Sequence, residues 1–446
     1  MYLLYSVLLV IWGFLLLPVY LYKAWRRGKS LPGLSQRFGS LPESLRSDGR
    51  PTIWFHSCSV GETLSMQPLV QMLHARFPAA RLVFSTITKT GQQVAIQRFA
   101  VYGAGNTFYF PIDFAYIVRR VMNWIRPSMM IIIDTEIWPN TLNQANLRGI
   151  PVVLANGRIS ASSFRHYRRA RPIMRRVFHN YRALMMQSED DALRIAQMGA
   201  PKDKVAVTGN IKIDMDLIDA APGEALAREL EECFDLRRAN SPLIIAGSTH
   251  EGEDQTLLHV LRSIRNVSGL EQTRLLLAPR HPERFDTVAR LVIQNGFRVH
   301  RRTESAGQNR DAEVLILDTV GELAAVYRFA TVAFVGGSLI RHGGHSIMEP
   351  ALYSRAIVIG PSMENFRQIA DEFHAHGGVL QISAGEKDSD AQVGQLADVF
   401  VKLLQNEKER EKLGKAAFAI LEKNRGATRR TAERIAAIFE ATRAFV

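Results

Sequence analysis

The sequence predicts an α/β protein of two doubly wound domains, each built on a parallel sheet. Apolar runs of β-strand length alternate with stretches of helical periodicity, which is the βαβ rhythm of such a sheet. The rhythm breaks between Leu217 and Asn240 and then resumes. The chain of 446 residues is also too long for one ordinary core, so two or three domains are expected.

Each series of apolar runs gives its own set of predicted strands. The first set is Thr52–Phe55, Leu82–Thr86, Met129–Ile133, Val152–Ala155, Leu184–Met186 and Val205–Thr208. Helices expected between these strands include Gln92–Phe99, Ala115–Ile125 and Asn140–Arg148. The second set is Leu243–Ala246, Arg274–Ala278, Val314–Leu317, Val332–Val335, Ala356–Ile359 and Val379–Ile382. The carboxyl-terminal stretch, rich in Lys, Glu, Ala and Leu, is expected to be helical.

The amino-terminal segment predicts a membrane anchor. Residues 1–22 carry no charged side chain and are numerous enough to span a bilayer. Basic residues follow at Lys23, Arg26, Arg27 and Lys29. A cleaved signal peptide would have positive charge before the apolar run and small residues after it, and neither is present. The positive-inside rule then keeps the rest of the chain in the cytoplasm, and Pro18 leaves open whether the segment spans the bilayer or enters one leaflet.

We therefore divide the chain into four parts. Residues 1–25 are the anchor, and residues 26–220 are an amino-terminal Rossmann-like domain. The Pro222–Gly223 pair and the charged helical stretch Glu224–Leu236 mark the junction, so residues 221–425 form the second Rossmann-like domain. Residues 426–446 are expected to be a helix that packs back on the first domain.

Charge and cysteine content narrow the class of protein. The formal net charge is +13. Six arginines are clustered, at Arg165, Arg168, Arg169, Arg171, Arg175 and Arg176. A nucleic-acid groove is one interpretation, but beside a membrane anchor an anionic lipid surface is the better one. A solvated helix face is a third. The two cysteines, Cys58 and Cys233, provide neither a disulfide framework nor a zinc site, and no metal is expected.

The stretch Trp54–Thr63, reading WFHSCSVGET, predicts a strand, a tight turn and the start of a helix. Apolar residues then recur at helical spacing, at Met66, Leu69, Val70, Leu73 and Phe77. Glu62 would thus lie in the first helical turn, at the carboxyl end of a strand, where open α/β sheets place their ligands. It is a candidate general base, but on spacing alone a carboxylate that only complements the helix dipole is favoured. Pro68 either kinks this helix or marks its true first turn.

A glycine-rich strand end in the second half is a candidate nucleotide site. Gly336, Gly337 and Ser338 follow a predicted strand, and a helix opens near Met348–Glu349. Glycines let a backbone approach a ligand closely, and a helix amino terminus favours phosphate. The run has neither the Gly-Lys-Ser/Thr ending of a Walker loop nor a GxGxxG pattern. Glu349 could accept hydrogen bonds from ribose hydroxyls.

Three more strand ends in the second half carry polar residues. Arg280 could bind phosphate, although a surface arginine is an equally good interpretation. Ser248–His250 could touch phosphate, but helix capping is favoured. Asp318–Glu322 follows a third strand, and together these ends indicate one nucleotide site better than any does alone. Asp214–Asp216 has the DxD spacing of metal-dependent sugar transferases, which we interpret as chance.

A set of motifs, in order along nearly the whole chain, identifies a family resemblance. They are SVGE at Ser59–Glu62, TEIWPN at Thr135–Asn140, GNIKID at Gly209–Asp214, STHEGE at Ser248–Glu253, PRHPERF at Pro279–Phe285, DTVGEL at Asp318–Leu323, GGHSIMEPA at Gly343–Ala351 and ENF at Glu364–Phe366. With them the chain resembles the 3-deoxy-D-manno-octulosonic acid (Kdo) transferases of Gram-negative bacteria. That family has the GT-B fold, in which two Rossmann-like domains face a central cleft.

The resemblance implies the substrates and the site. The donor would be CMP-Kdo and the acceptor a lipid A precursor, with no metal or other cofactor. The enzyme would lie on the cytoplasmic face of the inner membrane, against anionic lipids, and would bind no nucleic acid. Glu62 would be the base, while Glu136 and Lys212 would stabilise the transition state. CMP would be held by Pro279, Arg280, Val320, Gly321, Glu322, Ser346, Ile347, Met348 and Glu349.

The chain departs from the usual family pattern at Val320, Ser346 and Ser362, where the family commonly has Met, Asn and His. The implied mechanism tolerates these changes. Glu62 would take the proton of an acceptor hydroxyl, which attacks the anomeric carbon of Kdo from the face opposite CMP. Arg280 and the helix start near Ser346 would neutralise the leaving phosphate.

Two rival functions stay open. One is a membrane-associated GT-B transferase that uses a UDP-sugar and a lipid-linked acceptor. The other is a non-catalytic, membrane-anchored nucleotide-binding or scaffold protein. Inhibition by CMP rather than UDP would exclude the first, and a requirement for Glu62 would exclude the second.

Overall fold

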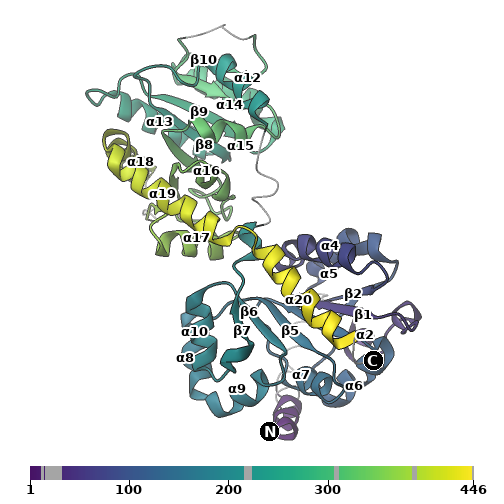
Figure 1. Cartoon of the computed structure of the whole chain (residues 1–446). Helices are drawn as coiled ribbons and strands as arrows, with labels where there is room; N and C mark the ends of the chain where they lie inside the picture. The colour runs from purple at the N-terminus through teal and green to yellow at the C-terminus, as the bar shows by residue number, and fades with distance from the viewer. Residues whose placement is uncertain (12–14, 16–32, 215–222, 306–310, 384–388, 444–446) are drawn as a thin grey trace. The chain divides into compact units, whose positions relative to one another are not determined.

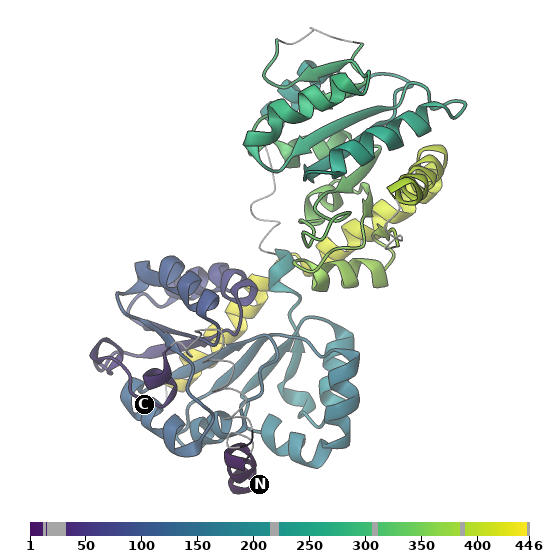
Figure 2. The same ribbon diagram turned by 180° about the vertical axis from the view of Figure 1, so that it is seen from behind.

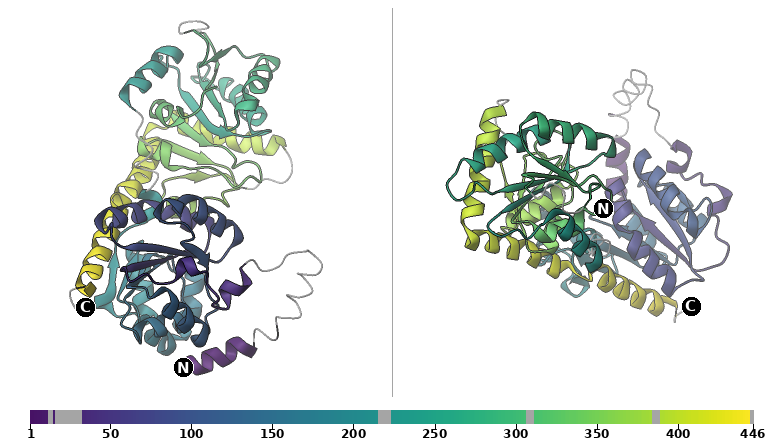
Figure 3. Two further views of the ribbon diagram at one scale, coloured as in Figure 1. Left: turned by 90° about the vertical axis from the view of Figure 1, so that its right-hand side faces the viewer. Right: turned by 90° about the horizontal axis from the view of Figure 1, so that it is seen from above.

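The computed structural model describes residues 1–11, 15, 33–214, 223–305, 311–383 and 389–443 and divides the chain into two compact units (Figure 1). The first unit comprises Met1–Met215 together with Gly426–Val446, and the second comprises Asp216–Arg425. The carboxyl-terminal residues therefore belong to the unit that contains the amino terminus. In both units a parallel sheet has helices on its two faces (Figures 2 and 3).

The sheet of the first unit has the strand order β3-β2-β1-β4-β5-β6-β7. Its strands are β1 (Thr52–His56), β2 (Arg81–Thr86), β3 (Thr107–Tyr109), β4 (Met129–Ile133), β5 (Val152–Gly157), β6 (Ala183–Met186) and β7 (Val205–Val207), and all of them pair in parallel. The chain first builds outward from β1 to β3 and then returns to add β4 on the other side. Open α/β sheets bind ligands at such a reversal of strand order, which here lies between β1 and β4.

Side chains alternate between the two faces of this sheet along each strand, and an apolar cluster covers each face. Ile53 and Phe55 face one apolar cluster, while Trp54 faces the other. The helices of the unit are α2 (Leu34–Arg37), α3 (Val60–Ser65), α4 (Gln67–Arg76), α5 (Lys89–Phe99), α6 (Ala115–Ile125), α7 (Pro139–Asn146), α8 (Ala161–Arg169), α9 (Arg171–Phe178), α10 (Glu189–Gln197) and α20 (Ala427–Arg443). In Figure 1, α20 lies beside α4, and its Phe439 packs edge-on against Phe77 with ring centroids 4.9 Å apart.

The sheet of the second unit has the order β10-β11-β9-β8-β12-β13-β14. Its strands are β8 (Leu243–Thr249), β9 (Arg274–Pro279), β10 (Val299–Arg301), β11 (Val314–Ile316), β12 (Val332–Val335), β13 (Ala356–Ile359) and β14 (Leu380–Gln381). Its helices are α12 (Glu224–Phe234), α13 (Glu253–Arg265), α14 (Phe285–Gln294), α15 (Leu323–Val326), α16 (Met348–Leu352), α17 (Arg367–Ala375), α18 (Ser389–Gln405) and α19 (Glu407–Asn424). The reversal of strand order lies between β8 and β12.

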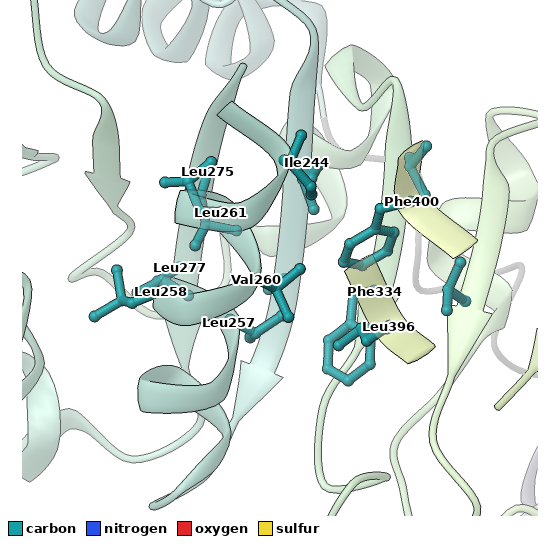
Figure 4. Packing of buried hydrophobic residues seen from close by; sticks show 14 of the residues in the cluster. Ile244, Leu257, Leu258, Val260, Leu261, Leu275, Leu277, Phe334, Leu396 and Phe400 are labelled. Atoms are coloured by element: carbon teal, nitrogen blue, oxygen red, sulfur yellow. The ribbon is translucent and has the colours of Figure 1, made fainter. Parts of the chain in front are cut away.

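One face of the second sheet is covered by a large apolar cluster. Leu257 and Leu261 from α13 meet Ile244 of β8, and Phe400 from α18 meets Phe334 of β12 (Figure 4). The rings of Phe334 and Phe400 are perpendicular, with centroids 6.5 Å apart. β8 and β12 also pair in parallel, so the residues that follow the two strands are brought together.

The structure confirms some predicted elements and adds others. Strands β4, β12 and β13 and helix α6 have the predicted bounds. Two short strands, β3 and β10, were not predicted. At Pro68 the structure decides between the two alternatives, because α3 ends at Ser65 and Pro68 lies in the first turn of a separate helix, α4.

The predicted anchor falls largely outside the described residues, which omit 12–14 and 16–32. Residues 2–11 are helical. The polar side chains of this helix contact the first unit: the Tyr2 hydroxyl accepts from the Asn180 amide at 2.6 Å, and Ser6 Oγ accepts from the Asn140 amide at 3.0 Å. Within the described ranges, no helix has both the length and the apolar character that crossing a membrane requires.

Candidate functional site

Glu62 lies on the first turn of α3, immediately after β1 and the turn. Ser59 is the N-cap of this helix, and its Oγ accepts from the Glu62 amide at 3.4 Å. The Glu62 carboxylate in turn accepts from the Cys58 amide at 2.6 Å and from the Ser59 hydroxyl at 2.8 Å. Ser59 to Glu62 therefore forms a variant of the capping box, which orients the carboxylate and satisfies the helix terminus together.

A second group of charges follows β4, the strand next to β1. Asp134 has a left-handed backbone, with φ of 58°, and is bonded on both sides. The Lys212 ammonium lies 2.7 Å from its Oδ2, and the Asn156 amide donates to its Oδ1 at 2.6 Å. Both side chains of the ion pair are mostly buried, with 17% of Lys212 and 15% of Asp134 exposed. Lys212 is thus held at this strand end.

Glu136 is close to Glu62 and Asp134. Burial, and then the charges of Glu62 and Asp134, raise the pKa of Glu136 to about 7. Burial raises the pKa of Cys58 to about 12, followed by the charge of Glu136, and its thiol is hydrogen-bonded to that carboxylate. At neutral pH Cys58 is therefore a neutral thiol, and Glu136 exchanges a proton readily.

Burial also raises the pKa of Glu62, and the charge of Asp134 adds to the effect. Hydrogen bonds from Cys58 and Ser59, and then the charge of Lys212, act in the opposite direction. A carboxylate with a raised pKa is a stronger base than a free one. The structure thus brings together the three residues predicted for this half of the site, Glu62, Glu136 and Lys212, and adds Asp134.

The segment that carries Lys212 is fixed by polar contacts to neighbouring strands. Asn156, with φ of 61°, lies near the end of β5, and its side-chain oxygen accepts from the Ile211 amide at 3.0 Å. Asp214 accepts from the amides of Gly426 and Thr428 at 2.7 and 2.9 Å, at the start of α20. The DxD spacing is therefore no metal site at Asp214, whose carboxylate instead holds the carboxyl-terminal helix; Asp216 lies outside the described residues.

In the second unit, Glu253 organises the glycine-rich strand end. Its fully buried carboxylate accepts from four amides: His250 at 2.9 Å, Gly337 at 2.7 Å, Ser338 at 3.0 Å and Leu339 at 2.9 Å. Gly337 has φ of 67°, and a Cβ there would lie 3.0 Å from the His345 ring. One carboxylate from α13 thus joins the ends of β8 and β12. The prediction that Ser248–His250 caps a helix is wrong, because the N-cap of α13 is Gly252.

Four histidines gather at these strand ends. His250 Nε2 lies 2.8 Å from His345 Nε2, and the ring centroids of His250 and His342 are 3.8 Å apart. The ring of His281 is 5.3 Å from that of His250. In the part of the chain that the structure describes, His250, His342 and His345 are the one group whose ligand atoms, all within 4.8 Å of one another, could hold a metal ion. Sequence spacing did not indicate this group because His250 lies far along the chain from His342 and His345.

The residues predicted to hold CMP lie at or after the ends of β9, β11 and β12, three of four consecutive strands in the sheet. Pro279 ends β9, exposed Arg280 follows it, and Val320, 79% exposed, follows β11 with Gly321 at φ of 89°. Ser346, Ile347, Met348 and Glu349 lead into α16. Ser346 Oγ accepts from the Met348 amide at 3.4 Å, although Ile347 is the N-cap.

Ser362, a departure from the family pattern, and Glu322, a residue predicted to hold CMP, both have partners in the structure. Ser362 is buried, and its Oγ accepts from the Gly343 amide at 3.1 Å, so it fixes the turn before His345. Glu322 is already ion-paired, with Arg302 Nε 3.1 Å from its Oε2. A nucleotide that contacts Glu322 would therefore meet a carboxylate that Arg302 already holds in place.

Asp134, Asn156 and Glu253 are the important residues that the sequence did not single out. For Asp134 a signal was present, because a lone carboxylate ends the apolar run Met129–Ile133, as Glu62 follows β1. Glu253 gave no such signal, since a glutamate at the start of a helix is ordinary. Only the neighbouring positions of β8 and β12 reveal its contacts.

The six clustered arginines lie on α8 and α9 and are all exposed. None of them forms an ion pair with a described carboxylate. These two helices therefore present an exposed and strongly cationic face, which all three interpretations of the arginines require.

Comparison with known proteins gives consistent findings. A family model for 3-deoxy-D-manno-octulosonic-acid transferases matches residues 32–215. The 3-deoxy-D-manno-octulosonic acid transferase of Haemophilus influenzae is 34% identical over 378 residues, which are 85% of each chain. That of Bordetella pertussis is 30% identical over 419 residues, 91% of this chain and 93% of that one. A solved structure, the carboxyl-terminal CMP-Kdo-binding domain of WaaA from Acinetobacter baumannii, is 31% identical with a TM-score of 0.40, covering 45% of this chain and all of that one.

Proposed function

The chain belongs to the 3-deoxy-D-manno-octulosonic acid (Kdo) transferase family, glycosyltransferases of lipopolysaccharide biosynthesis, and we propose that it transfers Kdo from CMP-Kdo to a lipid A precursor with inversion. The observation that carries this proposal is the carboxylate of Glu62 beside Asp134, Glu136 and Lys212, at the reversal of strand order between β1 and β4. The two relatives align with 85% and 91% of this chain.

Glu62 acts as the general base in the proposed mechanism. Its carboxylate is oriented by the Cys58 amide and the Ser59 hydroxyl, and the burial that raises its pKa strengthens it as a proton acceptor. The acceptor hydroxyl gives its proton to Glu62 as its oxygen attacks the anomeric carbon of Kdo. The bond from that carbon to the CMP phosphate breaks on the opposite face, so configuration inverts.

Lys212 and Glu136 tune this base in the proposal. The Lys212 charge favours ionised Glu62, while its pairing with Asp134 limits that effect. Glu136, with a pKa of about 7, would receive the proton from Glu62 or share it through the neighbouring groups. In this proposal Glu136 and Lys212 stabilise the transition state of the proton transfer to Glu62. The family resemblance implies transition-state stabilisation for both residues.

The second unit binds the donor in this proposal. Pro279, Arg280, Val320, Gly321 and Glu322 lie at adjacent strand ends of one sheet, and the run Ser346, Ile347, Met348 and Glu349 follows β12. Arg280 is exposed and forms no ion pair within the described residues, so its guanidinium can bind the phosphate. We propose that such cationic side chains take up the charge of the leaving CMP without a metal ion or other cofactor.

We propose that the two units form the GT-B fold, in which one Rossmann-like domain binds the acceptor and the other binds the donor. Two features support it. Each unit is a doubly wound parallel sheet, and each has its polar cluster at its own reversal of strand order. The base then belongs to the acceptor-binding half, and the phosphate-binding residues belong to the donor half.

We also propose that the protein works on the cytoplasmic face of the inner membrane, held by residues 1–25. The amino-terminal helix presents apolar side chains to solvent, with 80% of Leu3 and 63% of Leu4 exposed. Tyr2 and Ser6 bond the first unit from the same helix. The exposed arginines of α8 and α9 supply positive charge for anionic lipids and for a phosphorylated acceptor.

Mass spectrometry of a lipid A precursor incubated with the full-length protein tests the proposal. With CMP-Kdo the product gains the mass of one or more Kdo residues, and free CMP inhibits the transfer. UDP-sugars serve as the comparison: transfer from a UDP-sugar with none from CMP-Kdo would replace the proposal by its rival, and no transfer from either would favour a binding protein.

A further inference from the structure

The histidine pair at the ends of β8 and β12 carries a further inference, which rests on the proposed function of the second unit. His250 Nε2 and His345 Nε2 face each other at 2.8 Å, and their rings are nearly parallel, at 4°. Two ring nitrogens at this distance share one hydrogen, because one must donate and the other accept. A second proton on the pair would leave an N–H group on each Nε2, and these two groups would repel each other.

The surroundings of the pair are cationic. His345 lies near Arg280, His342 and His281, and His250 lies near His342, His281 and Arg284. The carboxylates nearby are turned to other partners: Glu253 accepts from four backbone amides, and Asp254 is paired with Arg284. Burial, and then the neighbouring histidines and arginines, lower the pKa of both His250 and His345 to about 4.

This charge distribution disfavours a divalent cation and favours an anion. A metal ion on the three histidines would lie beside Arg280, while the nearby carboxylates of Glu253 and Asp254 bond other partners. An anion would instead meet Arg280 and several ring N–H groups. The ligand chemistry that fits is a phosphate with more than one acceptor oxygen.

We propose that His250, His342 and His345 with Arg280 form the receptor for the donor's phosphate, and that the His250–His345 pair takes up one proton when the phosphate binds. The phosphate replaces repulsion between two N–H groups by attraction to each of them, so the second proton becomes favourable. The pair then separates, and both Nε2–H groups donate to phosphate oxygens.

The added proton matches the charge that the reaction creates. When the bond from the anomeric carbon to the phosphate oxygen breaks, its electron pair stays on that oxygen. The phosphate changes from a diester with one negative charge to a monoester with two. The proton taken up at the histidine pair offsets this second charge, while the proton of the acceptor hydroxyl goes separately to Glu62.

Calorimetric titration of the full-length protein with CMP at pH 7.5, in Tris and in HEPES, tests the proposal. At this pH the free CMP phosphate is already a dianion, so a buffer-dependent heat reports protons taken up by the protein. We expect uptake approaching one proton per CMP, and a CMP affinity that falls by up to about tenfold per pH unit above that pH. Cytidine, which lacks phosphate, should bind without uptake.

Variants locate the proton. His345→Gln and His250→Gln should lose the uptake, while His374→Gln, an exposed histidine on α17, should retain it. His342→Gln, at an exposed position, should reduce it and serves if a buried variant fails to fold.

Three outcomes would overturn the inference. CMP binding with no proton uptake would remove the histidine pair from the phosphate site and leave the proposed function standing. Uptake with Kdo alone and none with CMP would assign the cluster to the sugar carboxylate. About one equivalent of zinc in the purified protein, lost in His345→Gln, would make the cluster a metal site. Failure of both CMP binding and Kdo transfer would instead contradict the proposed function.

Discussion

The Lys212 ammonium lies 2.7 Å from the Asp134 carboxylate, and the charges of both groups affect the pKa of Glu62. Asp134 raises the pKa of Glu62, and Lys212 lowers it, so the two side chains oppose each other at the base. The pair lies at the end of β4, next to β1, and its two charges therefore influence the ionisation of Glu62, the proposed base.

This relationship predicts opposite pH effects for two substitutions. Asp134→Asn should lower the pKa of Glu62 and move the acid limb of the rate profile to lower pH, because the base is then ionised more easily. Lys212→Met should raise that pKa and move the acid limb to higher pH. Transfer rates measured against pH check both variants, and limbs that move in the same direction would contradict the assignment of Glu62 as the titrating base.

Burial of Glu136 predicts how stability depends on pH. Its pKa is raised to about 7 in the folded protein, so the folded state binds the proton more tightly than the unfolded state does. Its contribution to stability is therefore complete below about pH 4.5 and is lost as the pH rises through about 7. Glu136→Gln, which stays neutral, should gain stability relative to the native chain over this window.

Urea midpoints of the two chains at pH 5, 6, 7 and 8 measure this difference. Glu411→Gln is the matched control, because Glu411 is exposed and its pKa is lowered, chiefly by the hydrogen bond to Lys415. Its effect should be constant over the same range. A Glu136→Gln difference that is equally flat would show that Glu136 is ionised freely.

The four amide contacts of Glu253 predict a role in both stability and donor binding. Glu253→Gln keeps one acceptor oxygen and leaves up to two buried amides without a partner, which should lower the free energy of unfolding by about 1–3 kcal/mol. It should also weaken CMP binding, because the glycine-rich strand end loses its support. Denaturant unfolding and CMP titration measure the two effects, with exposed Glu251→Gln as the control, and an unchanged CMP affinity would remove the strand end from the donor site.

Asp214 is predicted to hold the carboxyl-terminal helix. Asp214→Ala removes the acceptors for the amides of Gly426 and Thr428 and should lower stability by about 0.5–2 kcal/mol, the range for loss of a helix cap. Hydrogen exchange should become faster in the first turn of α20. Unchanged protection there would mean that packing of Phe439 and its neighbours holds the helix without the cap.

Much of the fold could be predicted from the sequence because its strands are buried on both faces. β4 reads Met-Met-Ile-Ile-Ile, and β12 reads Val-Ala-Phe-Val, so each is a continuous apolar run. β3 and β10 are edge strands of three residues, Thr-Phe-Tyr and Val-His-Arg, and such short mixed runs carry no clear period. The order of strands is a tertiary property and came only from the structure.

Residues of the candidate site could be predicted where they directly follow a recognisable strand or open a recognisable helix. Glu62 follows a strand and opens a helix, and Arg280 follows a strand. By contrast, Glu253 reaches the glycine-rich strand end across 84 residues of chain from Gly337, and His250 meets His345 across 95. Contacts of this kind depend on which strands are neighbours, so the histidine pair had no sequence signal.

The central claim is that Glu62 is the catalytic base and that its capping role is secondary. Ser59→Ala offers the matched control, since it removes two of the hydrogen bonds at the helix start and leaves the carboxylate in place. Both variants should lose some stability. Only Glu62→Gln should lose the chemistry.

Turnover per folded molecule in Glu62→Gln, with CMP affinity measured on the same preparation, tests this claim most directly. We expect transfer of Kdo to fall by on the order of 10²–10⁴-fold, the usual contribution of a general base, with CMP affinity unchanged and a much smaller loss of rate in Ser59→Ala. Near-native turnover in Glu62→Gln would contradict the assignment and leave Glu62 as a helix-capping residue.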